Sequence, residues 1–144
     1  DLKDLASNRH ILIICLLAGF MVGPLEGFAD GWSTAFLEKV YGVDPSIAAS
    51  LPSLIFIGMC VGAPVLSFLA EKTKAYFTII SISGLIMGLS FVALLAGLLN
   101  VSLIAIVFFV IGMLCSYQIL AIYKAGTFAK PSSVGVTIAT ANMI

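Results

Sequence analysis

Long apolar runs alternate with short polar stretches along the whole chain. The runs cover residues 11–37, 47–70, 75–99 and 101–123, and a fifth, from about residue 132, is incomplete at residue 144. Each of the first four is close to or above the roughly 20 residues that a helix needs to cross a bilayer. A helix also satisfies its own backbone hydrogen bonds, which lipid cannot do. The pattern predicts an all-α integral membrane protein: one partial transmembrane domain over residues 1–144, with four full helices and the start of a fifth.

Composition supports a lipid environment. Apolar residues make up 61% of the 144 residues and charged residues 10%, with a mean hydropathy of +1.19; a soluble domain carries about 25% charged residues. A chain of this length cannot hide so much apolar surface from water, so we expect the lipid bilayer to be a partner. The formal net charge is zero, which gives no electrostatic reason to expect nucleic acid.

Polar residues mark the ends of the runs. Asp44 followed by Pro45 is typical of a helix start, with a capping carboxylate before proline in the first turn. Asn100 separates the third run from the fourth, and Pro131 fits the first turn of the last helix.

The positive charges predict an orientation. Lys39 alone follows the first run, and no cation lies between the third and fourth. The other six fall on one side, which the positive-inside rule makes cytoplasmic: Lys3, Arg9, Lys72, Lys74, Lys124 and Lys130. We therefore expect a multi-pass protein whose N-terminus is cytoplasmic.

Residues for metal or enzyme chemistry are sparse. Cys15, Cys60 and Cys115 lie in separate apolar runs without metal-ligand spacing, and His10 is the single histidine. There is no HExxH motif. We expect no metal, no cofactor and no enzymatic activity.

Glycines repeat at four-residue intervals, a spacing that lets helix backbones approach closely. The first run has a stripe of four, the second and third runs a pair each: Gly19, Gly23, Gly27 and Gly31; Gly58 and Gly62; Gly84 and Gly88. We expect close helix packing at the two pairs, whereas the stripe in the first run is a place where a neighbouring backbone can approach and is considered with the polar residues beside it.

On a helical wheel the first run has two unlike sides. One half holds small and polar residues, expected to face the protein interior or a wet cavity: Gly19, Gly23, Glu26, Gly27, Asp30, Ser33 and Thr34. The other half is apolar and expected to face lipid: Ile14, Leu17, Met21, Leu25, Phe28 and Trp32.

The carboxylates of that polar half are candidates for function, since an ionisable group inside a membrane is expensive. Glu26 lies about 22 Å along the helix from Ile11, at 1.5 Å per residue. It is our candidate for a gate and for proton coupling; a protonated or paired structural carboxylate is the alternative. Asp30 is a pathway candidate or a hydrated interfacial carboxylate. Gly23 and Pro24 predict a hinge, because proline removes a backbone hydrogen bond.

The fourth run carries a polar patch. Gly112, Ser116 and Tyr123 share one face of a regular helix, and Gln118 points elsewhere. Tyr117 and Gln118 are candidates for a solute pathway, as is Asn142 in the last run. Hydrogen bonding between helices is the alternative for each.

Four stretches together resemble the C-terminal half of a major facilitator superfamily transporter, from its seventh helix to the start of its eleventh. The stretches are Gly23–Trp32 running on to Gly42, Phe56–Pro64, Ser67–Lys74, and Pro131–Thr137 with Asn142. The third stretch, Ser67–Lys74, is similar to the superfamily's cytoplasmic loop motif. Glu71 stands at its acidic position and Lys72 at its basic one, although Ser67 and Lys74 replace its glycines.

The resemblance implies a secondary transporter that moves a small polar solute by alternating access. Its seventh helix would flank the central cavity and bend in its outer half, at Gly23 and Pro24. Glu26 and Asp30 would then face the cavity, with Tyr117 or Gln118 nearer the cytoplasm. The first segment is similar to permeases of intracellular gammaproteobacteria, including the phagosomal transporter group. This implies a bacterial inner (plasma) membrane and an amino acid or nucleoside as substrate, while coupling to protons is the separate hypothesis made for Glu26.

Both chain ends suggest a part of a larger protein, with five of twelve expected helices. The chain begins without Met and stops inside an apolar run. We expect an N-terminal half of the same transporter as partner, and self-association of the isolated piece. A membrane scaffold or assembly subunit is the alternative function, because glycine-lined packing alone would suit it equally well.

Overall fold

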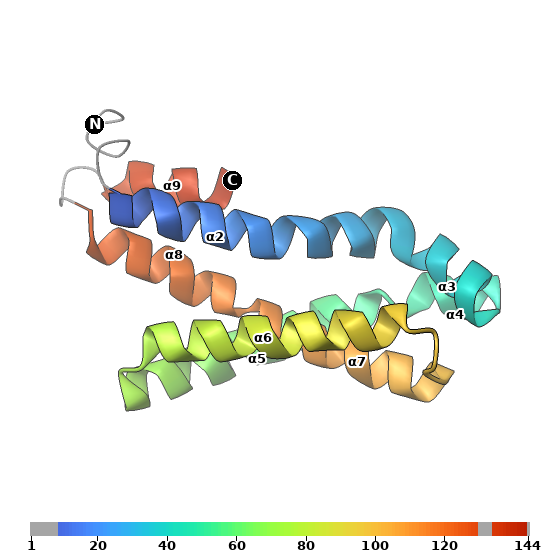
Figure 1. The fold of residues 1–144 in the computed structure, drawn as a ribbon. Coiled ribbons are helices and arrows are strands. Elements are labelled where there is room, and N and C mark those ends of the chain that lie inside the picture. The colour runs from blue at the N-terminus through green and yellow to red at the C-terminus, as the bar shows by residue number, and fades with distance from the viewer. Residues whose placement is uncertain (1–8, 130–133, 144) are drawn as a thin grey trace.

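The computed structural model describes residues 9–129 and 134–143, and every regular element in this part of the chain is a helix (Figure 1). This confirms the all-α prediction. The elements are α2 (Arg9–Glu26), the π-helix η1 (Gly27–Trp32), α3 (Ser33–Tyr41), α4 (Pro45–Ser50), α5 (Ser53–Thr73), α6 (Tyr76–Leu95), α7 (Val101–Cys115), α8 (Tyr117–Thr127) and α9 (Val134–Met143).

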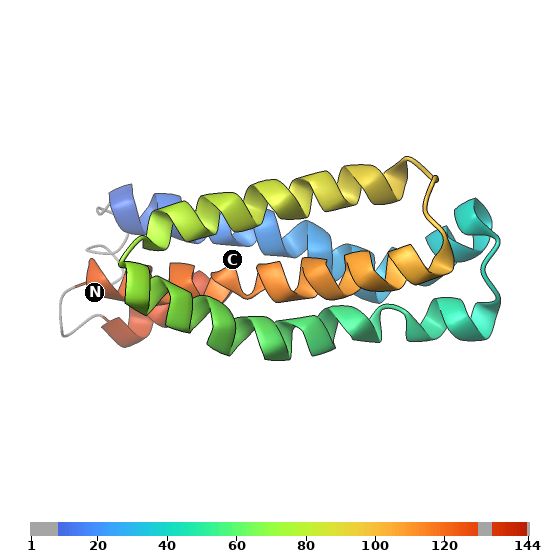
Figure 2. The ribbon, with the colours of Figure 1, turned by 90° about the horizontal axis from the view of Figure 1, so that it is seen from below.

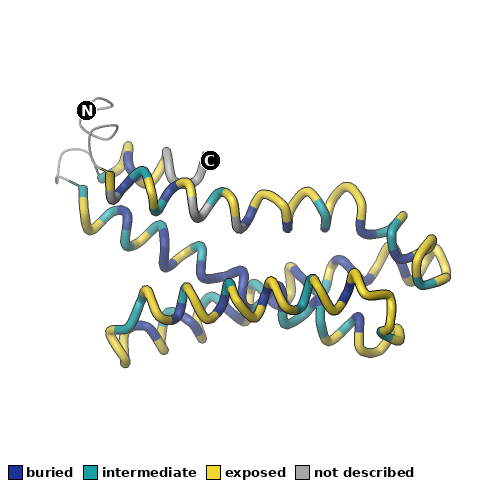
Figure 3. The backbone as a smooth tube through the Cα atoms, in the orientation of Figure 1, coloured by how far each residue is buried: buried dark blue, intermediate teal, exposed yellow. Residues whose placement is uncertain are grey.

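Three helical stretches in the described residues are long and apolar enough to cross a membrane. They are Pro45–Thr73, Tyr76–Leu95 and Val101–Thr127. Their outward faces are exposed along much of their length (Figure 3), and large apolar side chains stand on them, among them Phe68, Leu85, Leu89 and Val92. This distribution suits lipid as the surrounding solvent.

The helices lie side by side along one long axis (Figures 1 and 2). At one end of the bundle α5 turns into α6, and α2 begins; at the other end α6 connects to α7, and α3 and α4 lie nearby. We call these the α5–α6 end and the α6–α7 end. Helix α5 packs mainly against α7, while α2 packs against α8 and α9. Helix α8 also contacts α5 and α6, so it links the two groups.

Glycines bring α5 and α7 into backbone contact. A Cβ at Gly58 would overlap the carbonyl oxygen of Phe109, one at Gly62 that of Met113, and one at Gly112 that of Ile55. The prediction of close packing is confirmed for Gly58 and Gly62. It is wrong for Gly88, where no described atom lies within 4 Å of an added Cβ.

Two predicted helix starts are confirmed by their capping bonds. The Asp44 carboxylate accepts hydrogen bonds from the backbone N–H of Ser46 at 2.9 Å and from its hydroxyl at 2.7 Å. These bonds lower the pKa of Asp44, because they favour its charged form. The Asn100 side chain accepts the Leu103 N–H at 2.9 Å and caps α7.

Three predicted segments are less regular than expected. The first divides into α2, η1 and α3; the second begins with the short α4, followed by a turn at Leu51 and Pro52. The fourth divides at Ser116, where neither proline nor glycine interrupts the sequence. These breaks place short stretches of irregular backbone inside or beside the candidate spans, where their polar groups need partners.

Candidate functional site

The apolar side of the first segment packs inward, against the expectation that it would face lipid. Leu25 is only 2% exposed, and Phe28 packs against the central core. The prediction is therefore wrong for these two residues, although Trp32, which is 74% exposed, does face outward. Ser33, assigned to the polar half, is buried and donates to the Ala29 carbonyl at 2.7 Å.

Phe28 connects the first segment to the spanning helices. Its ring meets those of Phe91 in α6 and Phe108 in α7 edge to face, with centroids 5.6 and 6.1 Å apart. Phe91 lies four residues before the end of α6 and Phe108 seven residues after the start of α7. At 1.5 Å per residue these positions are about 6 and 10 Å inside the helix ends. Phe28 therefore lies at the depth of the apolar spans, and Glu26 lies two residues before it on the side leading away from the α6–α7 end.

The opposite side of α2 and η1 is uncovered. Glu26 and Asp30 are exposed, and no described atom lies within 4 Å of a Cβ added at Gly23, Gly27 or Gly31. We call these five residues the open face. No described part of the chain therefore packs against the glycine stripe at Gly23, Gly27 or Gly31.

The backbone irregularity in this segment follows Pro24 closely. Pro24 is exposed within α2, and the α-helical pattern changes to the π-helix η1 at Gly27. π-helical insertions occur mostly as short segments within α-helices and are frequent at functional sites. The irregular backbone therefore begins three residues beyond Pro24, whereas the α-helix continues through Gly23 and Pro24, where the hinge was predicted.

The break between α7 and α8 gathers polar atoms in the core. The Ser116 hydroxyl donates to the Met59 carbonyl of α5 at 2.9 Å. Tyr117 is fully buried, and its hydroxyl has no hydrogen-bond partner among the described residues. Gln118, the next residue of α8, is half-buried.

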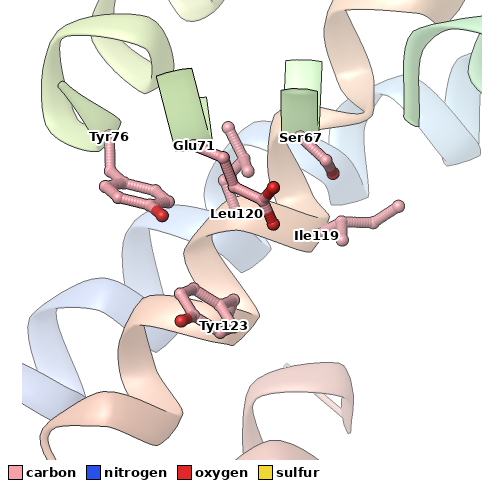
Figure 4. Close-up of a pocket in the computed structure, with 6 residues that line it drawn as sticks. All are labelled: Ser67, Glu71, Tyr76, Ile119, Leu120 and Tyr123. Carbon is pink, nitrogen blue, oxygen red and sulfur yellow. The ribbon is translucent and has the colours of Figure 1, made fainter. Parts of the chain in front are cut away.

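A separate cleft lies at the α5–α6 end (Figure 4), with an empty volume of about 340 Å³. The Glu71 carboxylate stands among the side chains of α5, α6 and α8 that line it: Ser67, Tyr76, Ile119, Leu120 and Tyr123. The Tyr76 and Tyr123 rings stack with centroids 5.9 Å apart, and Lys124 Nζ lies 4.4 Å from the Tyr76 ring centroid.

The residues of the predicted loop motif belong largely to a helix. Glu71 and Lys72 lie in the last turn of α5 rather than in a loop. Lys74 ends the helix with a left-handed φ of 57°, and its N–H donates to the Ala70 carbonyl at 2.8 Å. This is the position where the resembling motif has glycine, the residue that adopts such a φ most easily.

The predicted site residues therefore lie in separate places. Glu26 lies on the open face, Tyr117 in the core at the α7–α8 break, and Glu71 in the cleft at the α5–α6 end; the Asn142 side chain lies outside the described residues. No described group of His, Cys, Asp and Glu side chains could hold a metal ion. The sequence reasoning did not assign Ser67 or Tyr76 to a cleft, although Ser67 begins the Ser67–Lys74 stretch that it had singled out and Tyr76 lies two residues after that stretch.

Comparison with known proteins finds no match to this chain among protein families, curated sequences or solved structures.

Proposed function

We propose that this chain forms the C-terminal half of a secondary transporter of the major facilitator type, in which α2 and η1 line the solute pathway. The observation that carries the proposal is the open face, where Glu26 stands uncovered at the depth of the apolar spans. A charged carboxylate is expensive in hydrocarbon. The Glu26 carboxylate therefore needs water or polar protein groups around it. A central pathway between this chain and the helices of an N-terminal half supplies water from the pathway and protein groups from those helices.

The proposed mechanism is alternating access between two halves. Glu26 binds and releases the coupling proton, and Asp30 adds negative charge nearer the α6–α7 end. The α7–α8 break supports this role, since discontinuous helices commonly form the substrate and ion sites of transporters. Its Tyr117 hydroxyl and the Gln118 amide offer hydrogen bonds to a solute that reaches the break.

The proposal extends to substrate and location. The solute is small and polar, an amino acid or a nucleoside, and the membrane is a bacterial inner membrane. The N-terminus is cytoplasmic, which makes the α5–α6 end the cytoplasmic end. The distribution of Lys and Arg along the sequence supports this orientation.

Replacing Glu26 with Gln in the complete transporter, reconstituted in vesicles, tests the coupling role. We expect Glu26→Gln to abolish uptake driven by a pH gradient while solute exchange at equal pH persists. Glu38→Gln is the matched control, because Glu38 is an exposed carboxylate on α3. Unchanged gradient-driven uptake in Glu26→Gln would refute the proton assignment.

A membrane assembly subunit is the competing function, and the unoccupied glycines of the open face favour it. A subunit would bury this stripe against a partner helix, so Gly27→Leu would disrupt its complex while Glu26→Gln would leave it intact. The transporter proposal expects the opposite ranking for gradient-driven uptake, with Glu26→Gln the more damaging change.

A further inference from the structure

The cleft at the α5–α6 end combines negative charge, hydroxyl groups and aromatic rings with a small apolar wall. Glu71 supplies the carboxylate, and Ser67, Tyr76 and Tyr123 supply three hydroxyl groups around the same space (Figure 4). Ile119 and Leu120 form an apolar wall. This set of groups does not depend on the open face or on the proposed transport activity.

Glu71 has no cation paired with it in the described part of the chain. Its neighbours in the cleft are neutral, and the nearby ammonium of Lys124 lies over the Tyr76 ring. A carboxylate accepts hydrogen bonds at both of its oxygens. The cleft therefore presents acceptors and negative charge to whatever enters it.

Lys124 shows that the rim of this cleft already attracts an ammonium group. Its Nζ lies 4.4 Å from the centroid of the Tyr76 ring, well within the roughly 6 Å range of a cation–π contact. Lys124 belongs to α8 and follows Tyr123. Its ammonium lies over the face of the Tyr76 ring, beside the space lined by Glu71 and Ser67.

We propose that this cleft binds a primary alkylammonium ion. Its N–H donors bond to the Glu71 carboxylate, which stands between Ser67 on one side and Tyr76 and Tyr123 on the other (Figure 4). Its alkyl chain lies against Ile119 and Leu120. A quaternary ammonium lacks N–H donors and cannot make these bonds, so the site discriminates against it.

The test is calorimetric titration of the purified chain in an uncharged detergent with butylammonium chloride at constant ionic strength. We expect saturable binding of one ion per chain, and binding of tetramethylammonium at least about tenfold weaker, the equivalent of one lost charge-assisted hydrogen bond. Absence of saturable butylammonium binding, or equal binding of both ions, overturns the proposal.

Two substitutions act in opposite directions. Glu71→Gln keeps the shape of the side chain and removes its charge, so affinity should fall at least about tenfold. Lys124→Met removes a neighbouring positive charge and frees the face of the Tyr76 ring, so affinity should rise about two- to fivefold. Glu38→Gln, at an exposed carboxylate far along the chain on α3, should bind like the unchanged chain. Unchanged affinity in Glu71→Gln, or weaker binding in Lys124→Met, contradicts the assignment.

Ile119→Trp provides a second route if Glu71→Gln does not fold. Ile119 is 48% exposed, so a larger side chain fits there and fills the cleft without entering the core. Loss of binding with an unchanged helical spectrum supports the site, and retained binding overturns it.

Lipid and soluble amines share the primary ammonium group. Short-chain phosphatidylethanolamine that displaces butylammonium, where phosphatidylcholine does not, assigns a lipid headgroup as the source. Lack of displacement by either lipid assigns a soluble amine to the same site.

Discussion

Ser116 in the break between α7 and α8 donates its hydroxyl to the backbone carbonyl of Met59 in α5, at 2.9 Å. The bond joins residues 57 positions apart and crosses the most closely packed helix pair of the bundle. It gives the irregular backbone at Ser116 an anchor on the neighbouring helix.

Replacing Ser116 with Ala removes this anchor. We expect the free energy of unfolding in micelles to fall by about 0.5–1.5 kcal/mol, the usual net value of one such bond. Ser90→Ala is the control, because the Ser90 hydroxyl donates only to the Ile86 carbonyl of its own helix. Unfolding followed by circular dichroism measures both, and equal effects would contradict an anchoring role.

Gly112 tests the backbone contact between α5 and α7. A methyl group there would overlap the Ile55 carbonyl oxygen, so Gly112→Ala must push the helices apart. We expect a loss of about 2 kcal/mol or more in stability. In Gly88→Ala the new methyl meets no described atom within 4 Å, so stability should stay the same or rise by about 0.5–1 kcal/mol. Thermal unfolding of the two variants side by side decides the matter.

Lys74 is a non-glycine residue in the left-handed region, with φ of 57°. This conformation costs about 1–2 kcal/mol for an L-residue with a side chain. Lys74→Gly should therefore raise the free energy of unfolding by about 1 kcal/mol, whereas Lys72→Gly, inside the last turn of α5, should lower it by a similar amount. A denaturant titration that ranks the two in the reverse order would show that the C-terminus of α5 is not under this strain.

Tyr117 has a buried hydroxyl without a described partner. Because an unsatisfied buried polar group costs about 1–3 kcal/mol, Tyr117→Phe should stabilise the isolated chain by about 1 kcal/mol. Tyr41→Phe is its counterpart: the Tyr41 hydroxyl donates to the Leu94 carbonyl, and its loss should destabilise. A lower melting temperature for Tyr117→Phe than for the unchanged chain would indicate that the hydroxyl has a partner, such as water, after all.

Local chemistry made some of these features predictable. The starts of α4 and α7 follow from Asp44 and Asn100, whose side chains cap the helix within three residues along the chain. The close approach at Gly58 and Gly62 follows from their spacing, because only a missing Cβ lets another backbone come so near. The caps depend only on neighbouring residues, whereas the glycine spacing also needs a partner helix, which Gly23, Gly27 and Gly31 lack among the described residues.

Other features depend on neighbours that are remote in sequence. The wheel assigned Leu25 and Phe28 to lipid because hydropathy cannot distinguish an apolar core from a lipid tail. Phe28 packs against the rings of Phe91 and Phe108, more than 60 residues away in the sequence, and Leu25 belongs to the same buried cluster. The break at Ser116 was not predicted for the same reason. No proline or glycine stands at the break, and the feature that distinguishes it is the hydrogen bond from Ser116 to Met59 of α5.

The glycines of this chain differ in what a random mutation would do to them. Gly58, Gly62 and Gly112, between α5 and α7, face carbonyl oxygens of the neighbouring helix. Substitution at these positions is therefore disfavoured by packing alone, independently of the function of the protein. Gly23, Gly27 and Gly31 have open space around them and carry no such constraint from the described fold. Purifying selection at those three positions would therefore indicate a contact with a partner outside the described fold. A library of variants at the three positions, sorted by function, would show which of them makes that contact.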